Sequence, residues 1–483
     1  MQLKFISDSK QFAVKKGALI ILGNASWFRG AHHEKLLPPQ VPELFREALK
    51  NGKFGHTPTA LSSLTGLTAP SKVVLGILPE KVAKDNSPTR REWIYQLLEA
   101  IESEEHATII VCLDKPEHIP AAVSAAARRL RLVNYRKVAK TRNITFGALA
   151  PDGHFHPIEA HVKTLAEQVA WTCRMVDTAP NHLTSSVFSK EIQSLFKDVS
   201  GVSTKELVGE RLLKEGLHGI YNVGKAAVEA PRMLILDYKP KAAKKTVVLA
   251  GKGVCFDTGG LSLKGGANMV GMKSDMGGAA AVVGAFSMLV QAQVPHRIIA
   301  CLGLVENAIG PNAYRNDDVI VMHSGKSVEV NNTDAEGRLV LSDCLSYCAR
   351  TYKPQLLIDA ATLTGAQMVA TGLLHAAVIS NREELDRLAI KIGKETGDLV
   401  VPLPFAPELY QAEFKSQVAD MVNSVKNRSN AQTSCAAQFI YSHIDDLNIP
   451  WIHIDLAGPS TTAAGLGTGY GVQLITGLAR EFV

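Results

Sequence analysis

Short apolar runs and longer amphipathic stretches alternate through the first 150 residues of the chain. Runs of roughly four to eight residues rich in Val, Ile and Leu are typical of buried strands, whereas apolar positions three or four apart are typical of helices. The predicted strands are 18–22, 72–78, 107–113 and 144–149, and the predicted helices are 91–105 and 120–132. This alternation predicts an α/β domain with a partly parallel sheet.

A helical stretch without glycine or proline runs from 158 to 177 and ends at the breaker Thr178-Ala179-Pro180-Asn181. The alternation then resumes, with predicted strands at 232–238, 246–250, 297–304, 319–322, 355–360, 376–380 and 451–455, and predicted helices at 189–197, 279–291, 339–351, 383–395 and 471–481. The fold class is therefore α/β with two domains. We expect a smaller N-terminal α/β domain at 1–155, a linker helix at 156–180, and a larger C-terminal domain at 181–483 with a central mixed sheet flanked by helices.

Composition agrees with two core-forming domains, because 46% of the 483 residues are hydrophobic and 20% are charged. The seven cysteines are scattered and contain no C-x-x-C pair, which indicates a reducing compartment and predicts a cytoplasmic protein. Cys344 and Cys348 stand one helical turn apart, and two buried core residues are a better interpretation than a ligand pair. The N-terminus has no signal-peptide apolar region, and the apolar stretch 277–294 is predicted to be a helix buried against a sheet, so no membrane association is expected.

The net charge of +6 is unevenly distributed, because residues 1–160 alone carry +7. The run 128–142 contains seven basic residues and no acidic one. Such a run can bind nucleic acid or anionic lipid. A solvated helix face followed by a strand is the commoner explanation, and we favour it.

Two further signals are set aside. Residues 219–226 nearly spell a phosphate-binding loop, but Ala226 stands where that loop needs a hydroxyl for Mg²⁺. The pairs His32-His33 and His154/His156 have no acidic or cysteine partners at ligand spacing, so surface or structural histidines are expected.

Carboxylates gather where strands of the second domain are predicted to end. Asp257 follows a predicted strand inside a glycine-rich turn, at the edge where open α/β sheets form their sites. Asp275 precedes the helix at 279–291, where capping and a functional role are about equally plausible. Asp334 and Glu336 are two residues apart and point to one side in extended backbone, where they repel unless a cation such as a metal ion or Arg338 lies between them.

These four carboxylates, with Lys252 and Lys264 close by in the sequence, need about two divalent cations if they share one pocket. Oxygen ligands suit Mn, Zn or Mg. Two such ions ~3.5–4 Å apart can share a bridging water, lower its pKa and polarise a carbonyl, so hydrolysis is the natural chemistry. The chain has no H-E-x-x-H motif, and single-zinc chemistry of that type is not indicated.

The segments G-K-G-V-C-F-D-T-G-G-L-S-L-K at 251–264 and N-T-D-A-E-G-R-L at 332–339 resemble the leucyl aminopeptidase (cytosol aminopeptidase) family. The octapeptide matches that family's signature at every letter. The resemblance extends through most of 180–483, including D-A-A-T-L-T-G at 359–365, and the chain is similar to a bacterial member. The first ~150 residues resemble the family only in size and α/β character.

The resemblance implies two metal sites and two catalytic residues. A tighter site would use Lys252, Asp257, Asp275 and Glu336, and a more exchangeable site would use Asp257, Asp334 and Glu336. Lys252 would have to be neutral, because two dications depress its pKa. Lys264 would stabilise the oxyanion, and Arg338 would hold a bicarbonate ion that shuttles the proton.

The resemblance also implies the substrate and the assembly. Peptides with a free N-terminus would be trimmed, with Met272, Thr362, Leu363 and Gly365 forming the pocket for the first side chain and leucine-like residues preferred. Members of the family are typically homohexamers whose active sites face an inner cavity. Some bacterial relatives also bind DNA, so the rival hypotheses are a nucleic-acid-binding protein and a catalytically inactive scaffold.

Overall fold

The computed structural model describes residues 3–130, 132–137 and 142–482, and the chain divides into two compact units. The first unit comprises Met1–Ala170 with Gly393–Leu399, and the second comprises Trp171–Ile392 with Val400–Val483. The division between residues 170 and 171 falls inside the long helix α5 (Ala160–Asp177), which occupies the stretch predicted as a linker helix. The assignment of 393–399 to the first unit was not predicted.

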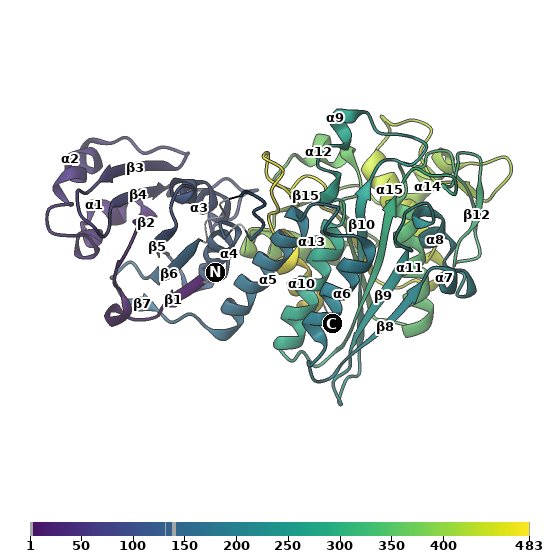
Figure 1. Cartoon of the computed structure of the whole chain (residues 1–483), viewed down its shortest axis with the longest axis horizontal. Coiled ribbons are helices and arrows are strands. Elements are labelled where there is room, and N and C mark those ends of the chain that lie inside the picture. Colours follow the sequence, from purple (N-terminus) through teal and green to yellow (C-terminus); the bar gives the residue numbers. More distant parts are fainter. Residues whose placement is uncertain (1–2, 131, 138–141, 483) are drawn as a thin grey trace. The chain divides into compact units, whose positions relative to one another are not determined.

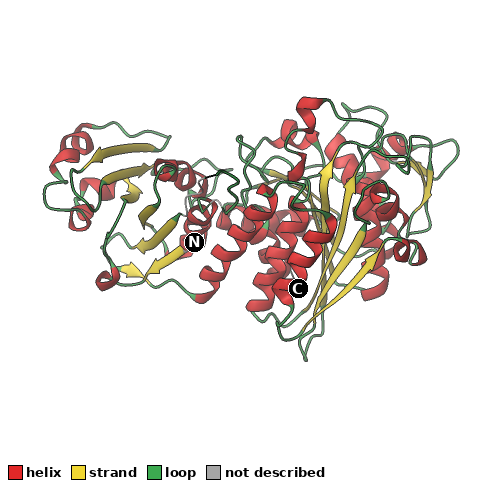
Figure 2. Cartoon of the chain, viewed as in Figure 1, coloured by secondary structure: helices red, strands yellow, loops and turns green. Residues whose placement is uncertain are grey.

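The first unit is built on a seven-stranded sheet in the order β1-β6-β5-β2-β4-β3, with β7 paired to β6 (Figure 2). Its strands are β1 (Leu3–Ile6), β2 (Ala18–Asn24), β3 (Thr59–Leu64), β4 (Lys72–Leu78), β5 (His106–Cys112), β6 (Asn143–Leu149) and β7 (Phe155–His156). The four predicted strands are confirmed as β2, β4, β5 and β6, which pair in parallel. The antiparallel edge strand β3 was missed because its side chains alternate between half-buried and exposed and give no apolar run.

Within the described residues the first unit has four helices before α5, of which the first two were not predicted and the other two are shorter than predicted. They are α1 (Ala25–Arg29), α2 (Glu43–Asn51), α3 (Arg91–Leu97) and α4 (Ile119–Arg128). The predicted helix 91–105 ends as α3 at Leu97 and continues only as a 3-10 turn over Leu98–Ile101.

The second unit contains an eight-stranded mixed sheet in the order β16-β15-β18-β14-β10-β11-β9-β8, which confirms the predicted architecture. Its strands are β8 (Val202–Val208), β9 (Arg232–Tyr238), β10 (Thr246–Asp257), β11 (Arg297–Asn307), β14 (Leu356–Ala361), β15 (Ala376–Ser380), β16 (Val400–Pro402) and β18 (Trp451–Asp455). A small second sheet joins β12 (Val319–Val321), β13 (Ser327–Glu329) and β17 (Met421–Val422). The short strands β13, β16 and β17 and the mostly polar β8 were not predicted, because none contains an apolar run long enough to indicate a strand.

Helices cover both faces of the large sheet. The helices that follow α5 in the described residues are α6 (Ser185–Phe196), α7 (Glu210–Lys214), α8 (His218–Gly224), α9 (Gly266–Met269), α10 (Gly277–Gln291), α11 (Gly337–Tyr352), α12 (Gly365–Thr371), α13 (Glu383–Thr396), α14 (Pro407–Tyr410), α15 (Gln432–Tyr441) and α16 (Val472–Glu481). The set-aside segment 219–226 lies largely in α8, so it is not the strand–loop–helix that binds phosphate.

Strand β10 separates two hydrophobic cores, as Figure 1 shows by the helices on either side of it. Val247 and Leu249 point into the core beneath α6, α10 and α16, whereas Val248 and Ala250 point into the core beneath α8, α11 and α15. This alternation is what a strand buried on both faces requires. Cys344 and Cys348 lie fully buried in the second core, which confirms the structural interpretation of that pair.

Helix α10 packs very close to the sheet. A Cβ atom on Gly278 would lie 2.1 Å from the carbonyl oxygen of Ala360, so only glycine fits at this point of contact. The apolar stretch at 277–294 is thus a helix buried against strands, as predicted. Among the residues that the structure describes, no helix is long and apolar enough to cross a membrane.

The pairing of β10 with β11 is irregular near its end. Val254 pairs with Val305 and Asp257 with Asn307, so β10 contains one more residue than β11 in this stretch. Such an irregularity has the form of a β-bulge, which re-aims the side chains that follow it.

Candidate metal centre

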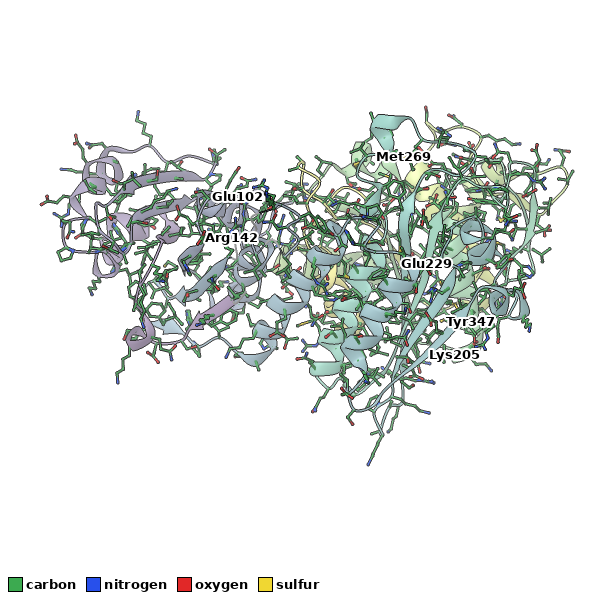
Figure 3. All side chains as sticks on the ribbon, viewed as in Figure 1. Glu102, Arg142, Lys205, Glu229, Met269 and Tyr347 are labelled. Carbon is green, nitrogen blue, oxygen red and sulfur yellow. The ribbon has the colours of Figure 1, made fainter. Side chains whose placement is uncertain are left out.

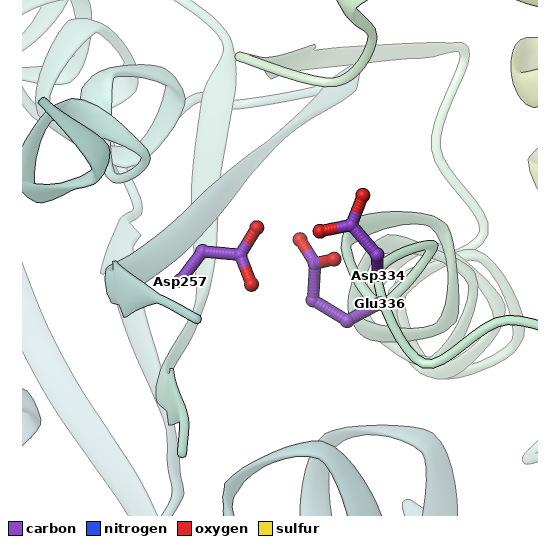
Figure 4. Close-up of side chains that lie close together, drawn as sticks. All are labelled: Asp257, Asp334 and Glu336. Atoms are coloured by element: carbon purple, nitrogen blue, oxygen red, sulfur yellow. The ribbon is translucent and has the colours of Figure 1, made fainter. Parts of the chain in front are cut away.

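Three carboxylates converge beyond the end of β10 (Figure 4). Asp257 is the last residue of β10, and Asp334 and Glu336 lie in the turn that leads into α11. One oxygen from each of these three side chains lies within 4.8 Å of the others. Asp257 and Glu336 are buried and Asp334 is half-buried, so the charges meet in a place largely shielded from water. This is the grouping of side chains that a divalent metal ion needs.

Two lysines join the carboxylates into one cluster. The Lys252 ammonium lies 2.8 Å from both Asp275 Oδ1 and Glu336 Oε1. The Lys264 ammonium lies 2.7 Å from Asp257 Oδ2 and also forms an ion pair with Asp334. The predicted convergence of acidic and basic residues from three separate segments therefore occurs in the structure.

The pKa values of the cluster show how crowded its charges are. Burial and the neighbouring charges of Asp257 and Asp275 raise the pKa of Glu336 to about 8. Burial and Asp257 likewise raise the pKa of Asp275 to about 6, against the opposing effect of Lys252. Burial acts to lower the pKa of Lys252, but Asp275, Glu336 and Asp257 outweigh it and raise that pKa far above its ordinary value. Excess negative charge thus holds protons in the cluster, and a cation would be bound in exchange for them.

Asp275 does not cap a helix, so the capping alternative is wrong. The residue before α10 is Met276, which makes no side-chain cap. Asp275 Oδ1 instead accepts a hydrogen bond from the Thr362 hydroxyl at 2.7 Å, beside its ion pair with Lys252. Asp275 Oδ2 is buried and has no hydrogen-bond partner within the described part of the chain, which leaves it available as a ligand.

A neutral side chain that the sequence did not reveal holds Asp257 in place, together with a backbone N–H. Asn307 is fully buried and donates to Asp257 Oδ1 at 2.8 Å and to the carbonyl of Thr333 at 3.1 Å. The backbone N–H of Gly259 also donates to Asp257 Oδ1 at 2.8 Å. Asn307 follows the buried run of β11, so the rule that found Asp257 at the end of β10 would have found it too.

A turn with left-handed glycines lets the loop after β10 reach the cluster. Gly259 has a φ of +83°, and a Cβ atom there would lie 2.8 Å from Asp334 Oδ1. A larger residue would therefore clash with a carboxylate of the site as well as strain the backbone.

Arg338 borders a small polar cavity beside the carboxylates. Its guanidinium is buried and donates to the carbonyl of Asn423 at 2.9 Å, while its Nε has no partner among the described residues. The cavity has a volume of about 90 Å³, and its lining includes Asp334, Leu363 and Gly365. Burial lowers the pKa of Arg338 to about 10, which still leaves it charged at neutral pH.

The residues predicted to bind the first side chain lie around the same centre. Thr362 bonds to Asp275, and Leu363 and Gly365 line the cavity beside Arg338. Met272 begins the 3-10 turn Met272–Ser274, which packs against β10 and leads directly to Asp275.

The basic run of the first unit is partly internal. Arg128 stacks on the ring of Tyr95, with 3.7 Å from its guanidinium carbon to the ring centroid, and Arg129 stacks on the other side at 3.9 Å. Arg142, labelled with Glu102 in Figure 3, donates to the Glu102 carbonyl at 2.6 Å. The expectation of a solvated face is therefore wrong for Arg128 and Arg129, which are buried.

Four basic residues of the run remain. Arg136 and Lys137 are exposed, whereas Arg131 and Lys140 lie outside the described residues.

Comparisons with known proteins agree with the site. The family model "Cytosol aminopeptidase family, catalytic domain" matches residues 170–476. "Probable aminopeptidase NPEPL1" of Mus musculus is 40% identical over 458 residues, which cover 92% of this chain and 85% of that protein. The apo structure of leucyl aminopeptidase from Trypanosoma cruzi has a TM-score of 0.89 at 36% identity and covers 100% of this chain and 97% of its own. The bottromycin maturation enzyme BotP in complex with Mn has a TM-score of 0.78 at 26% identity, covering 97% of this chain and 99% of its own.

The mixed sheet, the carboxylate–lysine centre and these matches define a metallo-exopeptidase. The chain belongs to the cytosol aminopeptidase family, and it is a metal-dependent aminopeptidase. The family resemblance read from the two sequence segments is thereby confirmed.

Proposed function

We propose that this chain is a two-metal leucyl aminopeptidase that releases N-terminal amino acids, leucine-like ones by preference, from peptides. The observation that carries the proposal is the approach of Asp257, Asp334 and Glu336 to within 4.8 Å, next to the Lys252–Asp275 pair. When ionised, four buried or half-buried carboxylates facing two ammonium groups give the cluster a net charge of −2, which favours cation binding.

Five side chains would hold the metals. One site would use Lys252, Asp257, Asp275 and Glu336, and the other Asp257, Asp334 and Glu336. Two divalent ions there would activate a water, polarise the peptide carbonyl and bind the free amine of the substrate. Mn is supported by its presence in the BotP complex, and Zn and Mg also suit oxygen-rich ligands. Lys252 would have to lose its proton to become a ligand, so its present ion pairs with Asp275 and Glu336 would be replaced.

Lys264 and Arg338 would act on the reacting peptide bond. Asp257 and Asp334 orient the Lys264 ammonium and hold it charged, so it can stabilise negative charge that develops on the carbonyl oxygen. Arg338 would hold a bicarbonate in the cavity beside it, where the anion would carry a proton to and from the site. The unpartnered Nε and the fixed guanidinium plane support this role.

Metal binding should be stoichiometric and dependent on pH. Chelator-treated protein titrated with Mn²⁺ in a calorimeter is expected to bind two ions per chain. The apparent affinity should rise between pH 6 and 8, because the raised pKa values of Glu336, Asp275 and Lys252 mean that bound protons must leave. Each displaced proton changes the affinity by roughly tenfold per pH unit.

The variant Asp334→Asn separates the two sites, since it should keep one ion and lose affinity for the other. A wild-type stoichiometry of one, or an affinity that does not change with pH, would contradict the two-metal proposal.

We also propose a cytoplasmic homohexamer that serves intracellular peptide turnover, as the family resemblance implies. Exposed apolar side chains follow the metal centre in the sequence, with Leu261, Leu263 and Val270 exposed by 49%, 56% and 82%. Contacts between subunits would cover such residues. Light scattering is expected to give six times the chain mass of 52.0 kDa.

Nucleic-acid binding is the second hypothesis. Among the described residues of the basic run, Arg136 and Lys137 are exposed and could contact phosphate groups. A gel shift at low and at physiological salt tests it. The hypothesis is supported if the chain slows the migration of nucleic acid and the double variant Arg136→Glu, Lys137→Glu does not. It is rejected if the unmodified chain causes no shift at low salt.

A further inference from the structure

A buried carboxylate outside the metal centre is tied to the loop that follows β14. Asp455 is the last residue of β18 and has 0% exposure. Its Oδ1 accepts backbone N–H bonds from Leu363 at 3.1 Å, Thr364 at 3.4 Å and Ala457 at 3.3 Å. Its Oδ2 accepts the Thr364 hydroxyl at 2.7 Å. One side chain thus fixes the backbone of the loop from the inside of the protein.

The same loop contacts the metal centre with its other side. The Thr362 hydroxyl donates to Asp275 Oδ1 at 2.7 Å, and the Thr362 carbonyl accepts from Lys252 at 3.0 Å. Thr362 therefore bonds to two of the proposed ligands at once. The next residue, Leu363, bonds to Asp455 through its N–H. Two neighbouring loop residues, Leu363 and Thr362, therefore connect Asp455 with Asp275 and Lys252 through hydrogen bonds.

We propose that Asp455 is a positioning residue of the aminopeptidase site, which sets loop 362–365 so that Thr362 orients Asp275 and Lys252 for metal binding and Leu363 and Gly365 shape the side-chain pocket. The inference rests on the proposed function, because the metal ligands and the pocket are those assigned there. Hydrogen bonds made directly to metal ligands, as Thr362 makes to Asp275 and Lys252, commonly change metal affinity by roughly 10–100-fold when they are lost.

A comparison with Asp343 distinguishes positioning from ordinary stabilisation. Asp343 also has 0% exposure and also accepts backbone N–H bonds, from Ile220 at 3.1 Å and His323 at 3.0 Å. Neither partner bonds to the metal centre. Removing either carboxylate leaves buried N–H groups without acceptors and should lower the melting temperature. Only the removal of Asp455 should also change the affinity for metal ions and the KM for the substrate.

The experiment compares Asp455→Ala with Asp343→Ala in the full chain. Calorimetry measures Mn²⁺ affinity, and steady-state kinetics with leucyl and alanyl anilides measures kcat and KM. Asp455→Ala is expected to weaken Mn²⁺ binding by about 10-fold or more and to raise KM for the leucyl substrate more than for the alanyl substrate. Asp343→Ala should lower the melting temperature and leave both quantities within about twofold.

Asp455→Asn is the conservative variant. Its Oδ1 can still accept the three N–H bonds, and the Thr364 hydroxyl can accept from the new amide while donating to Thr433 Oγ1, which lies 3.0 Å away. It should therefore recover most of the Mn²⁺ affinity and the leucyl KM. If Asp455→Ala does not fold, Thr364→Val removes the Oδ2 contact while keeping Asp455, and it should show the same pattern on a smaller scale. The Thr364 hydroxyl also contacts Thr433 and accepts the Gln367 N–H, so a part of any stability loss comes from those two bonds.

Two outcomes overturn the inference separately from the proposed function. An Asp455→Ala or Thr364→Val variant that loses stability but keeps wild-type Mn²⁺ affinity and KM values would make Asp455 merely structural. A wild-type chain that binds no Mn²⁺ would overturn the proposed function itself, and the positioning role with it.

Discussion

Replacing Glu336 by Gln is expected to lower kcat/KM for leucyl anilide hydrolysis by at least about 10³-fold. The variant keeps the shape of the side chain but removes a charge shared by both proposed metal sites. Glu336 also pairs with Lys252 at 2.8 Å, so the amide leaves that ammonium with one carboxylate partner instead of two. Activity and Mn²⁺ affinity should fall together, which stopped-assay kinetics and calorimetry on the same preparation would measure.

Asp237→Asn is the matched control for Glu336. Asp237 lies in β9 of the same sheet and pairs with Arg297 at 2.9 Å, away from the carboxylate cluster. Its loss should cost a small part of the stability and none of the activity. A Glu336→Gln enzyme within tenfold of wild type would remove Glu336 from the mechanism.

Replacing Lys264 by Met is expected to lower kcat by about 10²–10³-fold with little change in KM. The methionine keeps most of the side-chain length but removes the cation that faces the developing oxyanion. Unlike Glu336→Gln, this change should not weaken Mn²⁺ binding. Lys264 neutralises Asp257 and Asp334 in the structure, so its removal leaves those carboxylates more negative.

The variant Lys264→Arg tests whether the positive charge alone is sufficient, because arginine keeps the charge but has a different shape. It should retain more activity than Lys264→Met. If Lys264→Met kept wild-type kcat, or lost its metals, the oxyanion role would be wrong.

The contrast between these two variants follows from where the charges lie. Glu336 is a partner of the proposed metals, whereas Lys264 competes with them for Asp257 and Asp334. Weaker metal binding in Glu336→Gln but not in Lys264→Met, combined with losses of activity in both variants, would distinguish an oxyanion-binding lysine from a structural one.

The sequence predicted the catalytic unit well because its chemistry is concentrated in short segments. Asp257 follows an apolar run closely, and Asp334 and Glu336 share one turn, so local patterns were enough to single them out. The predicted turn around Asp257 is wrong, because β10 continues beyond the predicted strand end at 250 and ends at Asp257 itself. The metal centre itself depends on contacts that no local pattern contains. Asn307 reaches Asp257 across 50 positions, and Thr362 reaches Asp275 across 87.

Errors in the sequence interpretation have physical causes too. Arg128 and Arg129 were expected on a solvated face, but the ring of Tyr95 is placed between them by the packing of α3 against α4. Asp275 was as plausible a helix cap as a ligand, because both roles place a carboxylate just before a helix. Only the position of Thr362 and Lys252 decides between them.

The extra residue in β10 has a consequence for the direction in which Asp257 points. Lys252 and Asp257 are five positions apart, an odd number that in an evenly paired strand would send them to opposite faces of the sheet. The offset between Val254 and Asp257 absorbs one position and lets Asp257 turn toward the α11 side, where Glu336 lies. A perfectly regular β10 would aim Asp257 at α10 and break up the carboxylate group with every amino acid still present. The catalytic geometry of this enzyme therefore depends on the irregular pairing of β10 with β11 as well as on its acidic residues.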